Sequence, residues 1–94
     1  MGKFVFAFRA KDGRIPSPSE EAEWGRWFQE LGGTVTDYGN RVGSSRRLGE
    51  VGGLGGYVVV DAASLDAAVE LARGCPGLLH EGGIEVGEIV PSGA

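Results

Sequence analysis

The chain has 94 residues, of which 41% are hydrophobic and 23% are charged, with 18 glycines and a net charge of -4. This length and composition predict one globular domain over residues 1–94 and exclude a disordered chain. Nucleic acids and anionic membranes attract clustered Lys and Arg, so the acidic balance excludes both as expected partners. No apolar run approaches the roughly 18 residues that span a bilayer. A single cysteine, Cys75, with no partner at ligand spacing predicts a reducing, cytoplasmic location and no metal site.

Residues 3–9 predict the first strand, because aromatic and β-branched residues precede a turn signal at 11–13. Three phenylalanines occupy one face of this strand, and Val5 and Ala7 occupy the other. Both faces are therefore apolar, and we expect both to be buried.

Residues 17–31 predict a helix. Ser17 is the expected N-cap, Glu20 completes a capping box with it, and Gly32 ends the helix. Large apolar side chains recur at the spacing of one helical face: Trp24, Trp27, Phe28 and Leu31. Such a stripe is more often ordinary core than the wall of a ligand pocket.

A second strand is expected at 34–39, followed by a flexible arm at about 40–56 with a middle strand at 46–51. The arm holds Arg41, Arg46 and Arg47, which either bind an anion or are simply solvated. Its glycine cluster lacks the Gly-Lys-Ser/Thr ending of a phosphate-binding loop and leads into a strand. We therefore expect no bound cofactor here.

The C-terminal half predicts a strand at 57–60, a helix from its N-cap Ser64 to about Arg73, and a last strand at 82–90 before a frayed tail at 91–94. The order is that of a ferredoxin-like, split β-α-β fold of the α+β class, with both helices on one face of an antiparallel sheet. The other face of its apolar strands needs a cover, and the chain has no segment left to supply one. The pattern therefore predicts a homodimer formed through sheet-face packing.

The segments "LGGYVVVDAASLDAAVELARGCPG", "GGIEVGEIV" and "WGRWFQELGGTVTDYGN" resemble the YCII-related, DGPF-domain family of small bacterial proteins. That resemblance implies a dimeric α+β barrel, in a family whose biochemical role is generally unassigned. Some relatives carry a His near the first helix and an Asp near the second strand, proposed as a catalytic pair. Trp24 stands about where that His would lie, and Asp37 corresponds to the Asp. "GEVGGLGG" stands where many relatives have the Asp-Gly-Pro-Phe signature. Gly87 stands where an Arg often follows the "IEV" of the last strand in the family.

Asp37 is the candidate catalytic residue, as a general base or a ligand-binding group if it faces the barrel cleft. The alternative is a structural turn, which Asn40 and the neighbouring glycines fit well. His80, the one histidine, is expected on a surface loop, and Cys75 in the core with a raised thiol pKa.

Two functions remain open at this point. In the first, the cleft binds a small apolar or aromatic ligand between residues such as Trp24, Trp27, Tyr57 and Asn40. In the second, the chain is a non-catalytic dimerisation or accessory domain with a filled barrel interior. The sequence contains no residue constellation that specifies a named reaction.

Overall fold

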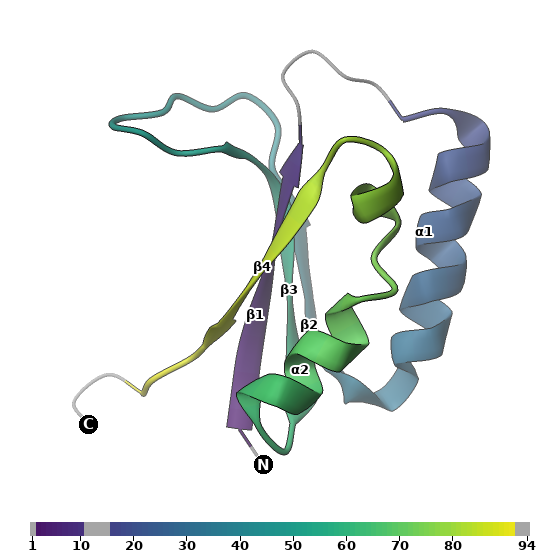
Figure 1. Cartoon of the computed structure of the whole chain (residues 1–94), viewed down its shortest axis with the longest axis vertical. Coiled ribbons are helices and arrows are strands. Elements are labelled where there is room, and N and C mark those ends of the chain that lie inside the picture. Colours follow the sequence, from purple (N-terminus) through teal and green to yellow (C-terminus); the bar gives the residue numbers. More distant parts are fainter. Residues whose placement is uncertain (1, 11–15, 92–94) are drawn as a thin grey trace.

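The structure, a computed structural model, describes residues 2–10 and 16–91 (Figure 1). Its elements follow in the order β1 (Gly2–Ala10), α1 (Pro18–Leu31), the 3-10 turn η1 (Gly32–Thr34), β2 (Val35–Arg41), β3 (Gly53–Ala62), α2 (Leu65–Ala72), the 3-10 turn η2 (Pro76–Leu79) and β4 (Gly83–Glu88). The strands form one antiparallel sheet in the order β2-β3-β1-β4. Figure 1 shows both helices on the same side of this sheet. The predicted α+β, ferredoxin-like fold is confirmed.

Both helices begin at the serines that the sequence indicates. The Ser17 hydroxyl accepts a hydrogen bond from the Glu20 backbone N–H at 3.2 Å, and the Ser64 hydroxyl accepts one from Ala67 at 3.1 Å. Each such cap stabilises its helix by about 1 kcal/mol. Gly32 ends α1 with a φ of 51°, a conformation that disfavours any side chain.

The core lies between the sheet and the two helices. It contains aromatic and aliphatic side chains from β1, β3, α1 and α2, most prominently Phe4, Phe6, Val58, Val60, Trp27, Leu31, Ala68 and Ala72. Phe6 stacks on Trp27 with 6.1 Å between ring centroids, and the Trp27 indole N–H donates to the Leu71 carbonyl at 3.2 Å. The indole is therefore buried with its polar group satisfied, as a buried tryptophan requires.

The face of the sheet away from the helices is also apolar at its centre. The half-buried residues there come from β1 and β3: Val5, Ala7, Tyr57 and Val59. Two ion pairs flank this centre, Lys3–Asp61 and Arg9–Glu85, each at 3.2 Å. We call this surface the open face. In the single chain it is only half covered, whereas the helix-facing phenylalanines Phe4 and Phe6 are fully buried.

The structure corrects the predicted arm. Residues 46–51 form no strand, and β3 begins at Gly53 rather than at Tyr57, so the loop between β2 and β3 spans 42–52. The reason is tertiary: the end of β1 pairs with Gly53 to Gly56 across an irregularity in the register. Glycine has low β-propensity, so composition alone hides this part of the strand.

Three further expectations concern the ends of segments. β4 ends at Glu88, and the Ile89 N–H still bonds the Lys3 carbonyl at 2.9 Å. The turn predicted at 11–13 and positions 92–94 of the predicted tail lie outside the described residues. Among the helices of the described ranges, none has the length and apolar character that crossing a membrane demands.

Candidate functional site

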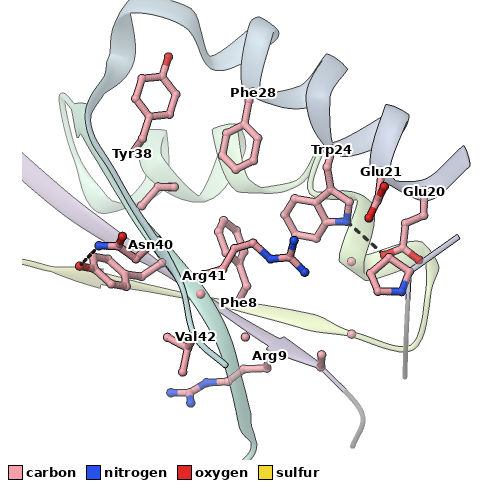
Figure 2. A pocket seen from close by; sticks show the side chains of 18 of the residues that line it. Phe8, Arg9, Glu20, Glu21, Trp24, Phe28, Tyr38, Asn40, Arg41 and Val42 are labelled. Atoms are coloured by element: carbon pink, nitrogen blue, oxygen red, sulfur yellow. Dashed lines mark hydrogen bonds between the residues drawn. The ribbon is translucent and has the colours of Figure 1, made fainter. Parts of the chain in front are cut away.

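A cavity of about 710 Å³ lies between the N-terminal half of α1 and the sheet (Figure 2). The end of β1, the β2 strand and the first half of β3 form its floor and one wall, and α1 forms the other wall. Its size falls within the range of small-molecule sites, which are concave and mostly apolar with a few polar groups. We call it the α1 cavity.

Aromatic rings make up much of the lining of the α1 cavity. Phe8 meets the edge of Trp24 with 4.9 Å between ring centroids, and Phe28 lies 6.1 Å from Trp24 and 6.4 Å from Tyr38. These separations are typical of attractive aromatic pairs. The rings therefore support one another and leave a preformed apolar surface (Figure 2).

A carboxylate cluster lies at one end of this lining. Glu20 is only 2% exposed, and its Oε2 accepts a hydrogen bond from the Trp24 indole N–H at 3.1 Å (Figure 2). His80 Nδ1 lies 3.8 Å from Glu20 Oε1, and His80 Nε2 lies 3.2 Å from Glu23 Oε2. The imidazole thus joins η2 to α1 through two carboxylates and is half-buried rather than on a free surface loop.

Sequence reasoning missed this cluster. Glu20 was assigned only to the helix cap, although positions 20, 23 and 24 share one helical face by the i, i+3, i+4 rule. That spacing was the available signal for a carboxylate beside Trp24. The approach of His80 has no local signal, because 57 positions separate it from Glu23.

The second strand contains a bulge that decides which of its side chains face the α1 cavity. Gly39 has a φ of 62°, and a Cβ added there would collide with the Tyr57 carbonyl oxygen. The Asp37 carboxylate accepts a hydrogen bond from the Gly39 N–H at 2.8 Å. The register between β2 and β3 shifts on both sides of Asp37. The segment predicted to leave the strand as a turn is therefore a bulge within it.

Asp37 lies outside the α1 cavity. It is opposite Val59 in the ladder, which places it on the open face, and its side chain is exposed. Its proposed catalytic role stays a prediction. Within the single chain, its observed contact is the hydrogen bond that holds the Gly39 bulge.

The other predicted site residues are divided between the cavity and the core. Trp24 lines the α1 cavity, whereas Trp27 lies in the core and does not. Asn40 and Tyr57 contribute to the lining, but Asn40 Nδ2 bonds the Tyr57 hydroxyl at 3.3 Å and turns away from the centre (Figure 2). Arg41 enters the cavity, and sequence reasoning had only placed it on an arm.

Burial raises the pKa of the Cys75 thiol from 9.0 to about 11, while hydrogen bonds from the Gly77 and Leu78 backbone partly oppose this shift. The predicted core position of Cys75 is confirmed. In the parts of the chain that the structure describes, no group of three or more His, Cys, Asp or Glu side chains is placed to hold a metal ion.

A family model for the YCII-related domain covers residues 4–92, which is nearly the whole chain, from within β1 to beyond the end of β4. Searches of curated proteins and of solved structures returned no significant match.

Proposed function

The chain belongs to the YCII-related domain family, and we propose that it binds a small apolar or aromatic ligand in the α1 cavity. The observation that carries this proposal is a preformed cavity of about 710 Å³ lined by Phe8, Trp24 and Phe28. An empty apolar surface of this kind costs free energy in water, and a ligand that covers it recovers roughly 25 cal/mol per Å².

The α1 helix itself supports the proposal. Gly25 lies within α1 and lines the α1 cavity, and a Cβ added there would meet no atom within 4 Å. Glycine inside a helix costs about 1 kcal/mol relative to alanine. Gly25 therefore weakens the helix, and its missing side chain leaves space at this point of the cavity lining.

Ligand binding can be tested with a panel of small aromatic and apolar compounds. We expect thermal stabilisation and a change in tryptophan fluorescence, because Trp24 lies in the lining. Trp24→Ala should abolish both responses, whereas Leu79→Ala should keep them, since Leu79 is 78% exposed and lies outside the cavity. If no compound stabilises the wild-type chain, or if Trp24→Ala responds as the wild type does, the proposal is wrong.

We also propose that two copies of the chain associate through their open faces. This association is what the alternative function, a dimerisation or accessory domain, requires. Support comes from the half-buried centre formed by Val5, Ala7, Tyr57 and Val59. An apolar centre flanked by ion pairs resembles the layout of stable protein interfaces. A second copy around a two-fold axis would supply the missing layer and complete the dimeric barrel that the family resemblance implies.

Light scattering on the purified protein tests this association. We expect a dimer at micromolar concentration and a monomer for Val59→Glu, which buries a charge at the predicted interface. Glu70→Lys on the exposed side of α2 is the matched charge control and should stay dimeric. A monomeric wild type would overturn the dimer proposal and leave ligand binding in the α1 cavity intact.

For the compartment, we propose the cytoplasm. The support is Cys75, a buried free thiol that a reducing environment preserves. Fractionation of cells that express the protein from its own gene tests this, and recovery in an oxidising compartment would contradict it.

A further inference from the structure

We propose that the ligand of the α1 cavity is an aromatic or apolar monocarboxylate whose carboxylate pairs with Arg41. This inference rests on the proposed function and names the class of ligand. It starts from the charged side chains that line the cavity within residues 2–10 and 16–91, which are two arginines and two glutamates: Arg9, Arg41, Glu20 and Glu21.

The first step is that, of the two described arginines in the lining, Arg41 is the one available to a ligand. Arg9 already bonds Glu85 at 3.2 Å and reaches the Gly52 carbonyl at 3.5 Å, and Figure 2 shows its guanidinium directed away from the cavity centre. The Arg41 guanidinium has no hydrogen bond or ion pair in the described parts of the chain. Figure 2 shows it extending from β2 across the cavity in the direction of Trp24. An exposed guanidinium that points toward aromatic rings and has no partner among the described residues is suited to bidentate capture of a carboxylate.

The second step is that the bulge at Gly39 places Arg41 there. Tyr38 faces α1, where its ring meets Phe28. Regular alternation from Tyr38 would send Arg41 to the open face, because neighbouring side chains in a strand point to opposite faces. The extra residue reverses this: Asn40 pairs with Tyr57 on the open face, and Arg41 lies opposite Gly56 on the cavity face.

The segment from Asp37 to Arg41 therefore positions the Arg41 side chain. Gly39 is needed for its positive φ and for the close approach to the Tyr57 carbonyl, and Asp37 fixes the Gly39 N–H. Asp37 then acts on binding through Arg41 without touching the ligand. This gives "TDYGNR" a function that a simple turn does not explain.

The third step concerns the number of charges on the ligand. The Glu20 carboxylate is engaged by the Trp24 indole and lies beside His80. Glu21 stands exposed on α1 at the cavity margin. One carboxylate neutralises Arg41, whereas a second negative charge would meet Glu21 and be repelled. The rings of the lining favour an apolar or aromatic body for the rest of the molecule.

Three matched probes test the proposal: 3-phenylpropionate, 3-phenylpropanol and 3-phenylpropylamine. Their dissociation constants are measured by calorimetry and by tryptophan fluorescence. We expect the wild type to bind the carboxylate about tenfold more tightly than the alcohol, the scale of one charge-assisted bidentate contact at a partly exposed site. The amine should bind most weakly. High salt should reduce the preference for the carboxylate, because exposed charges are screened.

Arg41→Gln removes the charge and keeps a side chain of similar reach. We expect it to bring carboxylate and alcohol within about twofold of each other, since only the charged contact is lost. Arg46→Gln is the control. Arg46 lies on the 42–52 loop, and its side chain does not line the cavity. It should keep the wild-type preference, and circular dichroism should confirm that both variants fold.

The outcomes separate this inference from the proposed function. Equal binding of alcohol and carboxylate by the wild type, tightest binding of the amine, or an unchanged preference in Arg41→Gln would each overturn the role of Arg41 and leave ligand binding in the α1 cavity standing. If none of the three probes and no compound of the wider panel binds, both proposals fall.

Discussion

The two ends of the contact between α1 and the sheet differ, although one apolar stripe supplies both. At one end, Trp27 is 3% exposed, stacks on Phe6 and donates its N–H to the Leu71 carbonyl. At the other end, Trp24 is half-buried, donates to Glu20 and lines the α1 cavity. The same residue type, three positions apart on one helix, forms core in one place and the wall of a cavity in the other.

The difference comes from what lies beside each ring. The segment after α2 approaches Trp27 so closely that a Cβ at Gly74 would lie 3.0 Å from its ring. Beside Trp24 lies η2, where a Cβ added at Gly77 would be 3.4 Å from its ring. Because α2 has only eight residues, it covers one end of the sheet, and the other end lies beneath α1 and the short η2 turn (Figure 1). Coverage by neighbouring elements, not the stripe itself, decides between core and cavity.

The largest test of this comparison is truncation of each tryptophan. Trp27→Ala should lower the free energy of unfolding by about 3–5 kcal/mol, because it leaves a large void in packed core. Trp24→Ala should cost about 1–2 kcal/mol, since its ring already borders open space. Urea denaturation measures both. Equal losses of unfolding free energy would contradict the distinction between a packed core at Trp27 and an open cavity at Trp24.

The next test concerns the bulge beside the α1 cavity. Gly39→Ala should destabilise the fold by about 2 kcal/mol or more, because it combines positive φ with a collision against β3. It should also weaken the carboxylate preference by displacing Arg41. Gly43→Ala is the matched control, since a Cβ there meets no atom within 4 Å, and it should be nearly neutral. A Gly39→Ala protein as stable as Gly43→Ala would argue against the bulge.

Cys75 tests whether the end of the α1–sheet contact that contains Trp27 excludes water, because its thiol is buried in the core. Its folded-state pKa of about 11 exceeds the ordinary 9.0, so between these values the unfolded thiol loses its proton while the folded one keeps it. The contribution of Cys75 to stability is therefore fully present below about pH 9 and is lost as the pH rises toward about 11. Urea midpoints from pH 8 to 10.5 should fall more steeply for the wild type than for Cys75→Ala. Parallel slopes would mean that the thiol ionises freely in the folded chain.

The smallest expected change in stability concerns Gly25, which lines the α1 cavity. Gly25→Ala should stabilise the protein by about 0.5–1 kcal/mol, because alanine restricts the unfolded chain and meets no neighbour in the helix. Thermal denaturation measures the shift, with Ala22→Gly in the same helix as the converse change. A destabilising Gly25→Ala would show that this part of the wall is closely packed.

Much of the candidate site could not be read from the sequence. Trp24 was named as a possible ligand contact, but so was Trp27, and no local pattern distinguishes them. Arg41 was assigned to an arm because the glycines at 39 and 43 resemble a turn, whereas pairing with β3 keeps the chain in a strand through Arg41. Glu20 and His80 meet only because η2 returns to α1, a contact across the whole fold.

The sequence by itself determined the order of elements, their caps and the apolar faces of β1 and α1, because periodicity and capping are local properties. Ser17, Ser64 and Gly32 act where their side chains or backbone freedom are needed, whatever surrounds them. Only the tertiary structure decided that Gly39 forms a bulge rather than a turn and that Arg41 points into a cavity. Those features depend on pairing and coverage between segments distant in the chain, and no short window of residues contains them.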